Sequence, residues 1–215
     1  MDNKISWALE CIEALKKEYP EAECSLDYGK DYELLFSTRL AAQCTDARVN
    51  IVTETLYKKY PSLEAFAEAD IEELENDVRP TGFFRMKARD LKAAARVILD
   101  DYGGKVPDTM EELLKIPGVG RKTANLVLGD IFGKPSYVCD THCIRITNLL
   151  GLTEGKDPTK VEMQLREILP PEEAGNFCHR LVLHGRAVCV ARRPNCAECV
   201  MKNFCSHAAS LGLAE

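Results

Sequence analysis

Apolar residues recur at helical spacing along most of this chain, and no stretch alternates apolar and polar residues with the period of two expected of a half-buried strand. Clear groups are Ile5, Ala8, Leu9 and Ile12, then Val49, Val52 and Leu56, and then Leu91, Ala94, Ala95 and Ile98. The breaks are the short stretches YPS, RPTG, DYGGKVPD, FGKPS and LPPEEAG, none of which is long enough for a flexible linker. No sequence repeat or coiled-coil heptad is found. The pattern predicts an all-α protein.

Length and composition narrow the class of protein. With 215 residues the chain can form one compact unit or two small lobes, because domains usually contain roughly 100 to 150 residues. No apolar run approaches the ~20 residues of a membrane span, and the first residues, MDNKISWALE, lack the features of a secretory signal. We therefore expect a soluble, cytoplasmic protein. In such a protein, ten cysteines indicate a metal site or reduced thiols rather than disulfides.

The charge of the chain argues at first against a nucleic-acid partner, because the formal net charge is −6 and phosphate binding depends on lysine and arginine. The charges are unevenly distributed, however. The segment 64–77 holds seven acidic residues and no base, whereas the segment 79–96 holds six bases and Asp90 as its only acid. A local patch can steer an anion whatever the total charge. Taken alone, the two segments are more typical of solvated helix faces.

The stretch IPGVGRKTANLVLGDIFG, residues 116–133, predicts two helices joined by a tight turn. Thr109 and Glu112 form a capping box that starts the first helix, whose apolar face is Met110, Leu113 and Leu114. Pro117 and Gly118 end that helix. The second helix buries Ala124, Val127, Leu128 and Ile131, which places Lys122 on the exposed face.

The turn itself suggests an anion site. Gly118 and Gly120 leave backbone N–H groups unobstructed at the positive end of the second helix, where a phosphate can bind. The alternative is an ordinary turn between two helices, with Lys122 a solvated lysine. Spacing alone favours that alternative.

Four cysteines near the C-terminus form a second constellation. Cys189, Cys196, Cys199 and Cys205 follow the pattern C-x6-C-x2-C-x5-C within seventeen residues. In a cytoplasmic chain, four thiols this close indicate a metal rather than disulfides. Structural zinc usually takes paired short spacings, so iron–sulfur ligation competes well with zinc. We interpret the other cysteines as buried small hydrophobic residues: Cys11, Cys24, Cys44, Cys139, Cys143 and Cys178.

Three separated motifs together resemble the endonuclease III family of helix-hairpin-helix DNA glycosylases. They are LLKIPGVGRKTANLVLGDIFGKP, then VCDTH, whose Asp140 lies eighteen residues after Lys122, and then the four-cysteine loop. LAAQCTDARVN and TGFFRMKA fit the same family upstream. The resemblance implies a six-helix domain at residues 22–134, with the helix-hairpin-helix at about 109–133. It also implies a domain built from residues 1–21 and 135–215 around a [4Fe-4S] cluster, with DNA lying across the cleft between the two domains.

The same resemblance assigns the chemistry. Lys122 would attack C1′ of a damaged, flipped-out nucleotide and expel the base, after which the Schiff base promotes β-elimination of the 3′ phosphate. The helix N-terminus and the neighbouring Arg121 suit this role because both disfavour a charged lysine. Asp140 is the predicted N-cap of the helix THCIRITNLLG, which Gly151 ends. By resemblance it is also the catalytic carboxylate that stabilises cationic character at the sugar.

Further roles concern the DNA partner. A flipped base leaves a gap in the duplex, which by resemblance Gln43 fills, and Phe83 is the candidate wedge on the opposite strand. A phenylalanine of a helical protein is more often part of the core. Arg192 and Arg193 lie within the cysteine loop, so we expect the cluster to hold them toward phosphate. The expected partner is double-stranded DNA with damaged bases, oxidised pyrimidines in particular, or abasic sites, bound by a monomer in the cytoplasm and, in a prokaryote, near the nucleoid.

Three other functions fit part of this sequence. A helix-hairpin-helix protein that binds DNA without catalysis would not need both Lys122 and Asp140. An iron–sulfur electron carrier would not need the hairpin. A mismatch adenine glycosylase would resemble this chain, but such enzymes usually lack the catalytic lysine and carry a further C-terminal domain.

Overall fold

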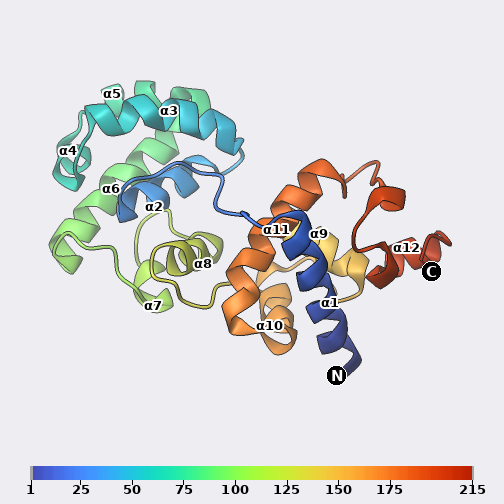
Figure 1. Cartoon of the computed structure of the whole chain (residues 1–215). Coiled ribbons are helices and arrows are strands. Elements are labelled where there is room, and N and C mark those ends of the chain that lie inside the picture. Colours follow the sequence, from blue (N-terminus) through green and yellow to red (C-terminus); the bar gives the residue numbers. More distant parts are fainter. Residues whose placement is uncertain (1, 215) are drawn as a thin grey trace. The chain divides into compact units, whose positions relative to one another are not determined.

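The computed structural model describes residues 2–214, and those residues form helices and no strand (Figure 1). The α-helices are α1 (Asp2–Glu18), α2 (Asp31–Leu40), α3 (Asp46–Lys59), α4 (Leu63–Glu68), α5 (Ile71–Val78), α6 (Phe84–Tyr102), α7 (Met110–Leu113), α8 (Arg121–Asp130), α9 (Thr141–Leu150), α10 (Pro158–Ile168), α11 (Ala174–Ala187) and α12 (Ser206–Ser210). The 3-10 helices are η1 (Arg79–Thr81), η2 (Pro171–Glu173), η3 (Cys196–Glu198) and η4 (Lys202–Phe204). The all-α prediction is confirmed. Of the helices described, none is long and apolar enough to cross a membrane.

The helices divide into two compact units. One unit contains residues 24–133, with helices α2 to α8. The other contains residues 2–23 together with residues 134–214, so that α1 packs against α10 and α11 from the far end of the sequence. Each unit has its own buried core.

Helix α6 is the central element of the unit formed by residues 24–133, because it packs against α2, α4, α5 and η1. Its predicted apolar face is buried, and every residue of that face is at most 1% exposed: Leu91, Ala94, Ala95 and Ile98. Phe66 of α4 fills the space beside α2, where its ring meets that of Phe36 edge to face with centroids 4.9 Å apart. The first turn of α6 lies beside the end of α2, where the side chain of Lys87 donates to the backbone carbonyl of Leu40.

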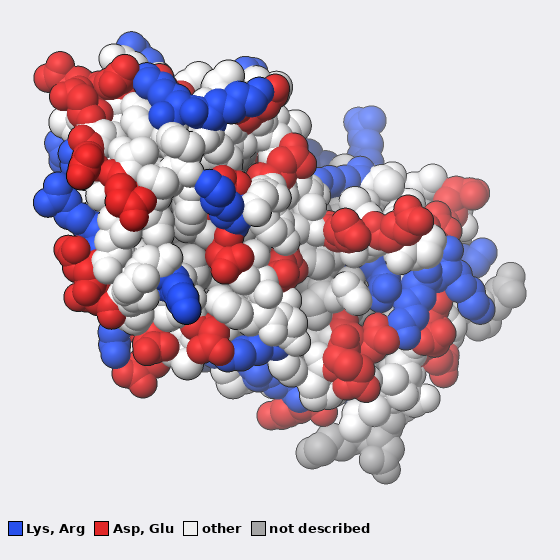
Figure 2. Space-filling model, turned by 60° about the vertical axis from the view of Figure 1, so that its left-hand side comes forward, with Lys and Arg blue, Asp and Glu red and all other residues white. Residues whose placement is uncertain are grey.

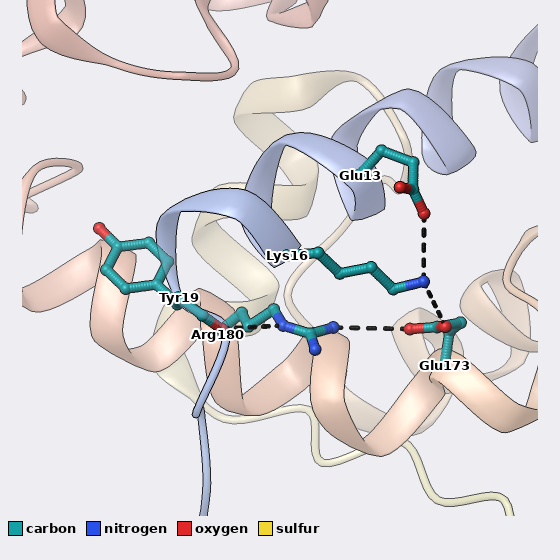
Figure 3. Close-up of polar contacts among 5 residues, drawn as sticks. All are labelled: Glu13, Lys16, Tyr19, Glu173 and Arg180. Carbon is teal, nitrogen blue, oxygen red and sulfur yellow. Dashed lines mark hydrogen bonds and ion pairs between the residues drawn. The ribbon is translucent and has the colours of Figure 1, made fainter.

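The other unit attaches α1 to α11 through a network of charged side chains (Figure 3). Lys16 lies 3.1 Å from the carboxylate of Glu13 and 2.5 Å from that of Glu173. Arg180 donates to the backbone carbonyl of Tyr19 at 3.2 Å and also meets Glu173 at 3.5 Å. The hydrogen bonds to Glu173 and Glu13 raise the pKa of Lys16. Because Lys16 and Glu13 remain partly exposed, each of their ion pairs contributes at most about 1 kcal/mol.

Five side chains that the periodicity assigns to apolar helix faces are not fully buried. Leu9 is 42% exposed and Leu114 is 43% exposed, and the half-buried ones are Ile5, Met110 and Ile131. Leu114 and Ile131 each lie one residue beyond the end of their helix, so the helical spacing no longer directs them toward the core. The capping box also differs in detail. Thr109 accepts from the N–H of Glu112 at 3.3 Å, but its hydroxyl donates to the Glu112 carboxylate at 2.6 Å.

Candidate functional site

The turn between α7 and α8 is held against the rest of its unit by a glycine. Gly118 has φ 77°, a left-handed conformation that L side chains rarely adopt. An added Cβ would lie 2.9 Å from Cβ of Asp90 and 3.1 Å from Cδ of Arg39. These two residues form an ion pair, with Arg39 Nε 2.6 Å from Asp90 Oδ2. Gly118 is therefore required both for its backbone conformation and for close packing.

The N-terminal end of α8 is open. Gly120 is the N-cap with extended backbone, and no atom lies within 4 Å of the position that its Cβ would take. The first turn of α8 contains no acidic residue, so the positive end of the helix is not neutralised from within that turn. Lys122 lies in this turn and is exposed, as the sequence predicts, and Arg121 is half-buried. The turn thus presents backbone donors and a lysine on one helix end.

Asp140 is the N-cap of α9, which confirms that prediction. Its Oδ1 accepts from the backbone N–H of Cys143 at 2.8 Å, and Gly151 ends the helix in the left-handed conformation. Asp140 is half-buried, so its carboxylate is fixed in direction and still reaches solvent. Lys122 and Asp140 belong to different units of the fold.

The four C-terminal cysteines line one small apolar cavity, together with Leu149 and Val188. Burial, together with the nearby thiols of Cys189, Cys205 and Cys196, raises the pKa of the Cys199 thiol to about 11. Within the described chain, no three His, Cys, Asp or Glu side chains converge as ligands of a single ion. Thiolates that share one zinc must all lie about 2.3 Å from it. Each cysteine of a [4Fe-4S] cluster binds a different iron, so the larger spread of thiols around one cavity fits such a cluster better.

Two side chains that sequence reasoning missed lie against these cysteines. Arg145 donates to Sγ of Cys189 at 3.3 Å, and Nε2 of His184 lies 3.3 Å from Sγ of Cys199. His184 is fully buried, and burial together with the Arg145 cation lowers its pKa to about 4. Its Nδ1 lies 3.2 Å from the hydroxyl of Tyr19, so both ring nitrogens have a hydrogen-bond partner. No local pattern marked His184, because its partners come from α1 and from the cysteine loop.

The remaining cysteines divide into two groups. Cys11, Cys139, Cys143 and Cys178 are buried, as predicted. Hydrogen bonds with Cys139 and Cys178, together with burial, raise the pKa of Cys143 well above its ordinary value. The prediction was wrong for Cys24 and Cys44, which are half-buried.

Gln43 and Phe83 share an unusual backbone conformation. Among the described residues they are the only non-glycine residues with positive φ, at 56° and 48°. Phe83 is 59% exposed and Gln43 is also exposed, so the expectation that a phenylalanine belongs to the core does not hold here. Holding a non-glycine residue in this region costs about 1 to 3 kcal/mol, and such residues cluster at functional sites.

The basic segment 79–96 is not simply a solvated face. Lys87 is fully buried, and Lys92 and Arg96 donate to the backbone carbonyls of Ala69 and Ala67. Figure 2 shows acidic and basic side chains interspersed over the viewed face, without a continuous area of one sign. Arg192 and Arg193 are exposed in the cysteine loop.

A glycine turn that presents an open helix end and a lysine, in a helical chain with a four-cysteine cavity, defines the class of helix-hairpin-helix DNA repair proteins. The chain matches the HhH-GPD superfamily of base excision DNA repair proteins over residues 36–171 and the iron-sulfur binding domain of endonuclease III over residues 189–205. It is 46% identical to the endonuclease III of Synechocystis sp. over 209 residues, which cover 97% of this chain and 95% of that protein. The chain belongs to the endonuclease III family.

Solved structures agree with this assignment. A non-covalent endonuclease III–DNA complex and a trapped endonuclease III–DNA covalent intermediate each superpose with a TM-score of 0.91. Each is 37% identical to this chain and covers 97% of it, with 98% of its own chain matched. The cofactor of this family is a [4Fe-4S] cluster. The domain that binds it matches residues 189–205, from Cys189 to Cys205.

Proposed function

We propose that this chain excises oxidised pyrimidines from double-stranded DNA and that Lys122 is its nucleophile. By family the chain is a base-excision repair DNA glycosylase and AP lyase, and it binds DNA. The observation that carries the proposal is the exposed Lys122 in the first turn of α8, beyond the open N-cap Gly120. A lysine that reaches solvent beside a candidate phosphate-binding turn can approach a sugar carbon of bound DNA, as a nucleophile must.

The amine of Lys122 forms a bond to C1′ of the flipped nucleotide as the bond between C1′ and the base breaks, and the departing base takes up the proton that the lysine nitrogen loses. The bond between C1′ and the ring oxygen then breaks, the oxygen takes a proton from solvent, and a protonated imine forms between Lys122 and C1′. The imine acidifies the hydrogen on C2′, and its removal expels the 3′ phosphate by β-elimination. Water finally hydrolyses the imine and restores the lysine. The sequence of steps therefore couples base removal to strand cleavage through one side chain.

Asp140 is proposed as the carboxylate that stabilises positive charge developing at the sugar. Its Oδ1 is held by the N–H of Cys143 at 2.8 Å, so the group is oriented before substrate binds. A preoriented charge needs no reorganisation when the transition state forms, and this is the usual origin of large electrostatic effects on rate. The cap and the catalytic role are thus compatible.

The DNA contacts follow from the same surfaces. Backbone donors at Gly118 and Gly120, with Arg121, would bind phosphate at the positive end of α8. Gln43 would fill the gap left by the flipped base, and Phe83 would act as the wedge on the opposite strand. The exposure and left-handed backbone of both residues support these roles. In the cysteine loop, Arg192 and Arg193 would add phosphate contacts.

The cysteine cavity would hold the [4Fe-4S] cluster through Cys189, Cys196, Cys199 and Cys205. When bound, the cluster supplies a rigid anchor for the loop and a redox-active group. The regular elements of the loop are the short η3 and η4, and a metal bound by four cysteines would cross-link the segments between them. Its proposed task is to hold Arg192 and Arg193 in place.

We further propose that the unit of residues 24–133, which holds α2 to α8, is the hairpin-containing domain predicted at residues 22–134, and that the other unit is the cluster domain. The protein would act as a monomer, because one chain carries both the hairpin and the cluster. It would act in the cytoplasm of a prokaryote, close to the nucleoid, because its substrate is chromosomal DNA and its thiols must stay reduced.

Trapping with borohydride tests the nucleophile. Incubation with a duplex containing an oxidised pyrimidine and borohydride should cross-link the protein to DNA through Lys122, because reduction converts the imine to a stable amine. Lys122→Gln should lose both the cross-link and strand cleavage while retaining DNA binding. Lys115, an exposed lysine beside the same turn that pairs with Glu111, provides the control: Lys115→Gln should cross-link normally. A cross-link that survives Lys122→Gln contradicts the assignment.

A further inference from the structure

Lys87, in the first turn of α6, is a fully buried lysine for which the family chemistry described above has no use. Its Nζ donates to the backbone carbonyl of Leu40 at 2.7 Å and to that of Thr81 at 2.7 Å. Burial lowers the pKa of Lys87. An ammonium group is costly to bury, and the cost is offset here by hydrogen bonds to two carbonyls that come from different segments of the chain.

The two segments held by Lys87 are those that carry Gln43 and Phe83. Leu40 is the last residue of α2, three positions before Gln43. Thr81 is the last residue of η1, two positions before Phe83. The ammonium group of Lys87 therefore links the two loops through their backbones, and each loop then continues into an exposed side chain on a left-handed residue.

A second contact strengthens the same connection. Arg39, next to Leu40, pairs with Asp90, one turn after Lys87 on α6, at 2.6 Å. Helix α6 thus holds the last turn of α2 at two points. The strained backbone of Gln43 and Phe83 can persist only where the surrounding structure determines it, and these contacts supply that constraint.

We propose that Lys87 is a positioning residue for base flipping, whose ammonium group sets the spacing of the loops that present Gln43 and Phe83 to the duplex. The proposal rests on the gap-filling roles proposed above for those two residues. The two strands of a duplex are a fixed distance apart, so Gln43 in the gap and Phe83 on the opposite strand must arrive with a fixed separation. Ordering two loops when DNA binds costs conformational entropy and weakens binding. Because Lys87 already links the loops in the free protein, this cost is smaller.

The test compares Lys87→Met with Lys92→Met in the holoenzyme. Methionine keeps the length of the side chain and removes the ammonium group. Lys92 is a matched control because it lies on the same helix and also donates to a backbone carbonyl, that of Ala69, which belongs to neither loop. Flipping is measured by the fluorescence of 2-aminopurine placed beside an uncleavable abasic-site analogue in a duplex.

We expect Lys87→Met to lower the flipping equilibrium at least about tenfold, the effect of one charge-assisted hydrogen bond, and Lys92→Met to leave it unchanged. The distinguishing result is the coupling with Gln43→Ala. In the Lys87→Met background, Gln43→Ala should have little further effect, because the side chain is no longer presented correctly. If Lys87 had only a structural role, the fold-changes in the flipping equilibrium caused by Lys87→Met and by Gln43→Ala would multiply in the double variant.

The outcomes separate the two proposals. If Gln43→Ala and Phe83→Ala each leave flipping unchanged, the gap-filling roles are wrong, and the positioning role is overturned with them. If those variants impair flipping but Lys87→Met does not, or if its effect multiplies with that of Gln43→Ala, only the positioning role is wrong. Should Lys87→Met not fold, Lys87→Gln, which keeps an N–H donor, replaces it in the same cycle. Failure of both variants to fold would assign Lys87 to stability alone.

Discussion

Replacing Gly118 by alanine should destabilise the unit formed by residues 24–133 far more than the same replacement at Gly120. A left-handed conformation costs alanine about 1 to 2 kcal/mol. The new Cβ would lie 2.9 Å from Cβ of Asp90, an atom that cannot move without moving α6, and such overpacking costs about 1 to 3 kcal/mol more. The expected loss in the free energy of unfolding is therefore about 2 to 5 kcal/mol.

Gly120 is the matched control because it lies in the same turn with ordinary backbone and open space around its Cβ position. Gly120→Ala should change the free energy of unfolding by less than about 1 kcal/mol, since the poorer N-cap is offset by a less flexible unfolded chain. Urea unfolding followed by far-UV circular dichroism measures both variants. With a slope of about 2 to 3 kcal/mol per molar urea, the midpoint of Gly118→Ala should fall by roughly 1 M or more.

The same turn tests phosphate binding. Gly120→Asp places a negative charge at the open end of α8 without a steric clash, so the fold should persist while DNA affinity falls about tenfold for every sequence alike. Binding is measured by fluorescence anisotropy with undamaged and damaged duplexes. Equal stability of Gly118→Ala and Gly120→Ala would refute the packing argument, and unchanged affinity of Gly120→Asp would show that the turn is only a connection.

Two further predictions concern the catalytic carboxylate and the cluster. Asp140→Asn should keep the cap and the stability of α9 but lower the rate of base excision at least about a hundredfold. The rate is measured in single-turnover assays with saturating enzyme. A rate close to that of the parent protein would show that Asp140 takes no part in the chemistry. The purified protein should be yellow-brown and contain about four iron and four sulfide ions per chain by elemental and sulfide analysis. Cys199→Ser should lose them and make the loop of residues 189–205 sensitive to protease, whereas a colourless, folded, zinc-loaded protein would contradict the cluster.

Much of the fold follows from interactions within one or two helical turns, and these were predictable. Asp140 caps α9 and Gly151 ends it because each acts on backbone groups a few residues away. The exposed position of Lys122 likewise follows from the apolar spacing of α8 itself. The family resemblance rested on the same kind of information, since each motif is a short, contiguous run of residues.

The errors at Leu9, Leu114 and Ile131 have a common cause. Periodicity indicates which side chains share a helix face. The length of the helix, and how much of that face other elements bury, depend on the elements packed against it. Helix α7 is a single turn, so Leu114 falls outside it and reaches solvent. A pattern along the chain does not contain that boundary.

Tertiary packing alone decided the environments of the buried polar groups. Lys87 bonds a carbonyl 47 residues away, His184 meets a hydroxyl 165 residues away, and Arg39 pairs with a carboxylate 51 residues away. By composition, a lysine or an arginine is a surface residue. Burying such a charge costs free energy, and this cost is offset only when distant segments of the chain bring hydrogen-bond acceptors to it. The helices and the motifs could therefore be predicted from local sequence. The contacts that orient the loops depend on distant residues and are determined only by the tertiary structure.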